Sequence, residues 1–225
     1  MVKVAVNIVT YNSADDIVAC IESVQAQTFR DFRIHILDND SRDETIMRIA
    51  MYDLDLVRST TNSGFAKAHN DLIKSFPAEF ALVLNPDAIL NPDFLEKIVG
   101  AIEQRADAAS ASGKLLRFDG RTIDSTGIVW TRNQRHLDRG ADEPDLGQYD
   151  APQDIFGLSG AAALYRVRAL HETSIDGQIF DEDFFAYRED ADLAWRLFAG
   201  QHSSILKQNS VALGQVGSQI QSRKI

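Results

Sequence analysis

The sequence predicts an α/β fold built on a mostly parallel, Rossmann-like sheet flanked by helices, and three observations support this. Short apolar runs rich in β-branched residues alternate with stretches in which apolar residues recur at helical spacing. Strands separated by helices of about 10–15 residues are typical of βαβ units, whose strands run parallel. A length of 225 residues, with 44% hydrophobic and 25% charged residues, suits a medium-sized globular domain.

Four strands are expected in the first half of the chain. Residues 2–10 (VKVAVNIVT) form an apolar, β-branched run, as expected of a strand that is buried on both faces. Further strands are expected over residues 32–37 (FRIHIL), 55–59 (DLVRS) and 80–84 (FALVL). Together they predict the strands of one parallel sheet.

Helix-start signals lie between these strands. Ser13 with Asp16, and Ser41 with Glu44, resemble capping boxes at the starts of two helices. Pro92 suits the first position of a later helix. The helices of this half are therefore expected over residues 13–24, 41–51, 65–73 and 91–102.

The alternation changes after about residue 105, which predicts a mixed second half. The expected elements are strands or a hairpin over residues 108–118 and 122–131, a long polar loop over 132–153, a buried strand over 156–167 and a helix over 190–199. Residues 1–105 and 106–225 are thus interpreted as two halves of one domain, the second completing a site that the first begins.

Composition excludes several classes of protein. A net charge of -10 argues against broad nucleic-acid binding, which needs dense Lys and Arg. The single cysteine, Cys20, excludes an internal disulfide and a Cys-based zinc cluster, and its place on an apolar stripe predicts a core residue. With no apolar run of about 18 residues and no leader pattern, we expect a cytoplasmic protein, and peripheral association with the inner face of the membrane stays open.

Polar clusters follow each predicted strand of the first half. They are Thr10-Tyr11-Asn12, Asp38-Asn39-Asp40-Ser41, Asn62-Ser63-Gly64 and Asn85-Pro86-Asp87. In an open α/β sheet, ligands bind at the carboxyl ends of the strands, so these clusters predict one shared site. Taken singly, each also fits an ordinary turn or cap, and Gly64 fits a backbone position with positive φ.

Two groups of acids are candidates for chemistry. Asp87 comes three residues after the end of the apolar run FALVL, where a carboxylate needs a partner. A hard divalent cation with free positions for phosphates is the natural one. Glu189, Asp190 and Asp192 lie among aromatic residues at the start of a predicted helix. These acids could stabilise the N-terminus of the helix through its dipole, or one of them could be a general base near a dry pocket. The residues alone do not decide between these two roles.

The polar clusters, in this order, resemble glycosyltransferase family 2, an inverting family with the A-type (GT-A) fold, and most closely its bacterial rhamnosyltransferase-like branch. The matching stretches spread across residues 4–198 and are VNIVTYNS, QTFRDFRIHILDNDSRDET, TNSGFAKAHN, LVLNPDAIL, GLSGAAALYR and FFAYREDADLAWRL. Asn85 replaces the first aspartate of the family's D-x-D element, as is usual for that branch.

The resemblance implies a role for each matching residue. Nucleotide binding is implied for Thr10, Tyr11, Asn12, Asp38, Asn39, Asn62, Gly64, Lys67, Asn85 and Pro86. Tyr11 would pack on a pyrimidine base, and Asp38 would accept a hydrogen bond from the N3–H of that base. This implies a UDP- or dTDP-sugar donor. Asp87 would hold Mg²⁺ or Mn²⁺, and Asp190 would be the catalytic base, with Glu189 as its substitute if the register differs by one.

The function implied is inverting transfer of a sugar, with rhamnose a candidate, to a glycan or lipid-linked acceptor in polysaccharide biosynthesis. Two alternatives stay open: a degenerate, non-catalytic binding domain, and a sugar nucleotidyltransferase, which TYNSADD disfavours because it has no glycine or lysine. A homodimer also stays open. Trp130, His136 and Trp195 are candidate acceptor contacts, with a solvated loop or helix packing as the plain alternative.

One departure from the family lies near the C-terminus. Many relatives carry a metal-binding histidine about 20 residues after the E-D helix, and they often continue into further helices. Here that stretch reads SVALGQVGSQ, with Gly214 and Gln215 and no histidine, and the sequence ends at Ile225. The expectation is a cation held by Asp87, phosphates and water alone, or a weakened site.

Overall fold

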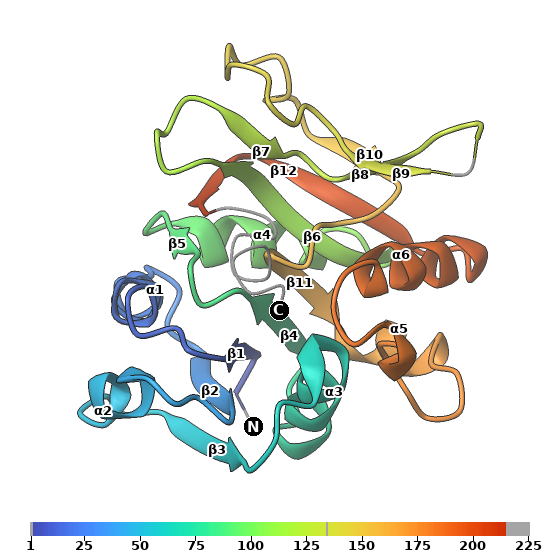
Figure 1. The fold of residues 1–225 in the computed structure, drawn as a ribbon. Helices are drawn as coiled ribbons and strands as arrows, with labels where there is room; N and C mark the ends of the chain where they lie inside the picture. Colours follow the sequence, from blue (N-terminus) through green and yellow to red (C-terminus); the bar gives the residue numbers. More distant parts are fainter. Residues whose placement is uncertain (1, 134, 215–225) are drawn as a thin grey trace.

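The computed structural model of the chain describes residues 2–133 and 135–214 and has a central sheet with helices on both faces (Figure 1). The strands are β1 (Val4–Thr10), β2 (Phe32–Asn39), β3 (Asp55–Ser59), β4 (Phe80–Leu84), β5 (Ile89–Leu90), β6 (Ala108–Leu116), β7 (Ile123–Ser125), β8 (Ile128–Trp130), β9 (His136–Asp138), β10 (Gln153–Ile155), β11 (Ala162–Arg166) and β12 (Ser203–Leu213). The helices are α1 (Ile17–Gln25), α2 (Thr45–Ile49), α3 (Gly64–Ser75), α4 (Phe94–Glu103), α5 (Val167–Glu172), a 3₁₀ turn η1 (Glu182–Phe184) and α6 (Glu189–Ala199).

The main sheet has the strand order β10-β12-β6-β11-β4-β1-β2-β3, with β5 and β7 beside it. The strands β4, β1, β2 and β3 are parallel, as the sequence predicts, and Thr10 is in register with Asp38. The strand β11 runs antiparallel to β4 and β6, whereas β12 is parallel to β6. Strands from both halves of the chain therefore join one mixed sheet.

Two apolar cores sandwich this sheet. Because successive strand residues point to opposite faces, Phe80, Leu82 and Leu84 of β4 pack under α1, α2 and α4, while Ala81 and Val83 pack under α3, α5 and α6. The strand β4 is therefore buried on both faces, as its unbroken apolar run predicts. Cys20 is fully buried in the first core, which confirms its expected place.

Two helix starts differ from the capping-box predictions. The helices α1 and α2 begin at Ile17 and Thr45, four residues after each expected cap. The carbonyl of Ser13 accepts from the amide of Ile17 in a turn that precedes α1. The hydroxyl of Ser41 accepts from the amide of Asn12 instead of capping α2. Both serines thus shape loops at the strand ends.

The second half differs more from its prediction. The expected loop over residues 132–153 contains β9, which pairs with β8 in a separate two-stranded sheet. Of the expected strand over 156–167, only Ala162–Arg166 forms a strand, and α5 begins directly after it at Val167. The strand β12 was not predicted at all. Within the described ranges, no helix combines the length and apolar character needed to cross a bilayer.

Candidate active site

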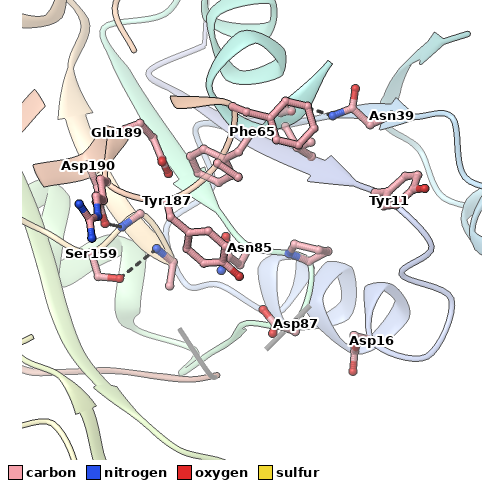
Figure 2. Close-up of a pocket in the computed structure, with 18 of the residues that line it drawn as sticks. Tyr11, Asp16, Asn39, Phe65, Asn85, Asp87, Ser159, Tyr187, Glu189 and Asp190 are labelled. Atoms are coloured by element: carbon pink, nitrogen blue, oxygen red, sulfur yellow. Dashed lines mark hydrogen bonds between the residues drawn. The ribbon is translucent and has the colours of Figure 1, made fainter. Parts of the chain in front are cut away.

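A cavity of about 790 Å³ opens at the carboxyl ends of β1, β2 and β4, where ligands bind in open α/β sheets. Its volume is in the usual range for small-molecule sites, about 300–1,000 Å³. Predicted site residues in its lining are Tyr11, Asn12, Asn39, Asn62, Gly64, Asn85, Pro86, Asp87, Glu189 and Asp190. In Figure 2, Glu189 and Asp190 lie on one side and Asp87 on the other, with Tyr187 between them. Acids from both halves of the chain thus face one cavity.

Asp38 and Thr10 lie behind the cavity wall and hold a loop together. The Thr10 hydroxyl donates to Asp38 Oδ1 at 2.9 Å, and the amide of Ser41 donates to Asp38 Oδ2 at 3.0 Å. The backbone amide of Asn12, a residue with a φ of 52°, donates to the Ser41 hydroxyl at 2.8 Å. Asp38 is 1% exposed and is not among the lining residues, so its direct contact with a ligand stays a prediction.

The start of α3 forms a second side of the cavity. Asn39 donates to the carbonyl of Gly64 at 3.0 Å, and Asn62 accepts from the amide of Gly64 at 2.9 Å. Gly64 has a φ of +86°, and a Cβ there would come within 2.5 Å of the Phe185 carbonyl oxygen. Lys67 is not part of the lining and pairs with Asp71 at 3.2 Å. The interpretation of Gly64 as a position with positive φ is therefore confirmed.

A segment of the second half lies over the first turn of α3. The carbonyl of Phe185 accepts from the amides of Phe65 and Ala66, at 2.7 and 3.2 Å. Phe185, Tyr187 and Arg188 all have positive φ, at 59°, 71° and 74°, which is uncommon and costly for residues with a Cβ. Strained backbone of this kind concentrates at ligand sites, and here the segment also forms cavity wall.

Asp87 lies in a tight turn after β4. The amide of Asn85 donates to the Ala161 carbonyl at 2.9 Å, and the amide of Ala88 donates back to the Asn85 carbonyl at 3.1 Å. Asp87 is 5% exposed and lines the cavity beside Asp16 (Figure 2). This turn therefore fixes a carboxylate at the cavity wall.

The residues around Asp87 suit a cation that is shared with a ligand. Among residues 2–133 and 135–214, no cluster of three or more His, Cys, Asp or Glu could hold a metal. Mg²⁺ is usually bound by one or two carboxylates together with phosphates and water, so the residues present fit such an ion. Gly214 packs against Ala88, beside the carbonyl of Asp87, and Gln215 lies outside the described residues.

The acid pair lies at the start of α6 and differs in its contacts. Asp190 accepts from the amides of Gly160 at 3.2 Å and Ala191 at 2.8 Å. Burial raises the pKa of Asp190, and these two donors act against that rise. Glu189 is 5% exposed, and its Oε2 has no hydrogen-bond partner in the part of the chain that the structure describes.

Burial favours the neutral form of both neighbouring carboxyls. Burial, and then the charge of Asp190, raise the pKa of Glu189 to about 8. Asp190 is the better placed to ionise because two amides donate to it. The two amide donors therefore favour the charged form of Asp190, whereas Glu189 Oε2, with no partner among the described residues, is held toward its neutral form.

Comparison with known proteins places this chain in a family. The family model described as glycosyl transferase family 2 matches residues 5–174, well over half of the chain. The chain belongs to glycosyl transferase family 2. This is the family that the polar strand ends and the E-D helix resemble in sequence.

Curated relatives agree with this assignment over part of their length. The chain is 27% identical over 96 residues to an uncharacterized glycosyltransferase of Haemophilus influenzae, covering 42% of this chain and 33% of that protein. It is 30% identical over 124 residues to the succinoglycan biosynthesis protein ExoO of Rhizobium meliloti, covering 54% and 34%. The chain thus spans about a third of the length of these two relatives.

Solved structures share the GT-A-like fold. S. aureus TarS 1–349 in complex with UDP-GlcNAc superposes with a TM-score of 0.72 at 20% identity, over 99% of this chain and 62% of that one. GalNAc-T7 with UDP, GalNAc and Mn²⁺ superposes with a TM-score of 0.75 at 11% identity, over 96% and 44%. The predicted GT-A-like fold class is therefore confirmed for this member of family 2.

Sequence reasoning missed several residues in the lining. Ile128 and Asp138 of the β8–β9 hairpin, with Ser159 and Tyr187, were not predicted as part of the site. His136, named only as a candidate acceptor contact, also lines the cavity. Three-residue strands inside a polar stretch carry too little periodicity to be recognised.

We expect Glu189→Gln to remove a pH-dependent loss of stability. The pKa of Glu189 rises from 4.5 to about 8 on folding, so the folded protein keeps a proton that the unfolded chain releases in this window. Between these two pKa values, the Glu189 carboxyl therefore lowers the free energy of unfolding of the wild type by roughly 1.4 kcal/mol for each unit that the pH rises. Urea denaturation should show the variant's advantage widening from pH 5 to pH 8. A stability difference that does not change with pH would contradict the assignment.

Proposed function

We propose that this family 2 domain is an inverting, metal-dependent transferase that moves a sugar from a UDP- or dTDP-linked donor to a hydroxyl of a glycan or lipid-linked saccharide. The observation that supports this best is that Asp87 and Asp190, from opposite halves of the chain, line one cavity of about 790 Å³. That volume suits a nucleotide-sugar. TarS with UDP-GlcNAc and GalNAc-T7 with UDP and Mn²⁺ share its fold, which supports the donor class and the cation.

In the proposed reaction, Asp190 takes the proton from the acceptor hydroxyl as its oxygen attacks the anomeric carbon of the donor. The bond to the nucleoside diphosphate breaks in the same step, so the anomeric configuration inverts. The amides of Gly160 and Ala191 hold the Asp190 carboxylate in place. A divalent cation, when bound at Asp87, supplies positive charge that stabilises the departing diphosphate.

The β1–β2 side of the cavity is the proposed nucleotide pocket. Tyr11 is 41% exposed and lines the cavity, where its ring can stack on a pyrimidine. Asn39 and Asn62 hold the start of α3 beside it. Asp38 would select the base chiefly through the loop that it fixes, because both of its oxygens already accept hydrogen bonds.

A thermal-shift screen tests this function. The protein is mixed with UDP-, dTDP- and GDP-sugars in the presence of Mn²⁺, with dTDP-rhamnose included because the motifs resemble the rhamnosyltransferase-like branch. A UDP- or dTDP-sugar at 100 times its Kd should stabilise the fold by about 2.7 kcal/mol, and EDTA should remove the effect. Stabilisation by GDP-sugars alone, or by no nucleotide, would contradict the proposal.

A further inference from the structure

Four aromatic side chains form an exposed cluster near the catalytic end of the cavity. We call Trp130, Phe156, Trp195 and Phe198 the aromatic ledge. Ring centroids lie 5.2 Å apart for Trp130 and Trp195, 5.7 Å for Trp130 and Phe156, and 5.8 Å for Phe156 and Phe198. Trp130, Trp195 and Phe198 are 41%, 47% and 60% exposed. Contiguous exposed aromatic surface of this kind marks an interaction site.

The ledge continues the cavity wall. Ile128 pairs with Asp138, and Trp130 pairs with His136, across the β8–β9 hairpin. Because alternate strand residues share a face, Ile128 and Trp130 lie on one face together with these partners. The cavity is lined by Ile128, His136 and Asp138. Trp130 therefore lies on the same face of the hairpin, directly beside the cavity lining.

The ledge also shares a helix with the proposed base. Asp190 lies in the first turn of α6 and lines the cavity, and Trp195 and Phe198 follow on the same helix. The proposed nucleotide pocket is formed by β1 and β2, elements that do not contribute to the ledge. A bound molecule that extends out of the cavity past Asp190 and along the β8–β9 hairpin would therefore contact the aromatic ledge.

We propose that the aromatic ledge binds the acceptor as a saccharide chain, through sugar units beyond the one that receives the transferred sugar. This inference rests on the proposed function, in which the acceptor hydroxyl must reach Asp190. The C–H faces of sugar rings stack on aromatic rings, while their hydroxyls stay in contact with water at the ring edges. Neighbouring ledge rings are tilted by 37° to 48°, which suits successive, rotated sugar units.

The charge of the chain favours a saccharide over an anionic membrane surface as the occupant. Peripheral attachment to such a surface relies on clustered Lys and Arg. The chain has a net charge of -10, which opposes approach to acidic lipids. An uncharged or weakly charged saccharide meets no such barrier.

Intrinsic fluorescence and a glycan array test the ledge directly. The sequence contains two tryptophans, and both are in the ledge, so tryptophan emission reports on this surface alone. Labelled wild-type protein is applied to a printed array of defined mono- and oligosaccharides, and the hits are titrated in solution while emission is followed. We expect oligosaccharide hits without the matching monosaccharides, and about tenfold weaker binding for Trp195→Ala.

Leu137→Ala is the matched control. Leu137 is 54% exposed and belongs to the same hairpin, but it pairs with Val129 and so lies on the opposite face from Trp130. This variant should bind the same saccharides as the wild type. UDP titration of all three proteins shows separately whether the donor site is intact, so a failure of the proposed function is distinguished from a failure of the ledge.

Several outcomes would overturn the inference. An array without oligosaccharide hits is one, and hits that Trp195→Ala leaves unchanged are another. A change in emission with phosphatidylglycerol–phosphatidylcholine vesicles, in the absence of any saccharide effect, would assign the ledge to lipid instead.

Discussion

Replacing Asp190 with asparagine is expected to lower sugar transfer by a factor of about 10²–10⁴, the usual contribution of a general base. The amide keeps the shape of the carboxyl between the Gly160 and Ala191 amides but cannot take a proton. Release of UDP or dTDP from the donor found in the thermal-shift screen measures turnover. Calorimetric titration with the free nucleotide should give nearly the wild-type affinity, because Asp190 acts on the acceptor.

The control for this variant is Asp192→Asn. Asp192 lies in the same first turn of α6, but it pairs with Arg196 at 2.8 Å and is not part of the cavity lining. It fits the helix-stabilising interpretation of the three acids, whereas Asp190 faces the cavity. Equal losses of turnover in both variants, or parallel losses of turnover and nucleotide affinity in Asp190→Asn, would place the base elsewhere.

Removing the Asp87 carboxylate with Asp87→Ala is expected to weaken Mn²⁺-dependent nucleotide binding on the order of 10²-fold, because a bound cation contributes several kcal/mol of charge stabilisation. Titration of UDP with Mn²⁺ and with EDTA measures the effect. The wild type should lose affinity in EDTA, and the variant should show the same weak affinity in both conditions.

Asp71→Ala serves as the comparison for Asp87→Ala. Asp71 is a half-exposed acid that pairs with Lys67 on α3 and is not part of the cavity lining. This variant should keep the metal requirement of the wild type. If Asp87→Ala keeps it as well, Asp87 is not a metal ligand.

Much of the first half of the fold follows from the sequence because β1 and β4 are buried on both faces. An unbroken apolar run such as Phe80–Leu84 has few other stable places than the middle of a sheet covered by helices. Helix starts were less predictable, since Ser13 and Ser41 have their hydrogen bonds in loops at the strand ends. A side chain suited to capping can equally serve a turn.

The second half could not be predicted to the same degree. The strand β12 owes its place to pairing with β6 and β10 rather than to its own mixed composition. Strand formation depends heavily on such neighbours. The β8–β9 hairpin brings His136 to the cavity only through tertiary packing, so no local pattern indicates its position.

The candidate site was predictable where it depends on topology. Parallel strands end at one edge, so Tyr11, Asn39 and Asp87 meet there whatever the loop details. The burial of Asp38 and the segment at Phe185 that covers α3 were not predictable, because both depend on contacts between distant loops. Glu189 Oε2, which has no hydrogen-bond partner within residues 2–133 and 135–214, likewise takes its place only once α6 is packed.

A crystal structure with UDP and Mn²⁺, with manganese located by its anomalous scattering, tests the central claim most directly. We expect a manganese peak in contact with both the Asp87 carboxylate and the diphosphate, with Asp190 facing the space next to the β-phosphate. Bound UDP whose manganese lies away from Asp87, or whose diphosphate points away from Asp190, would contradict it.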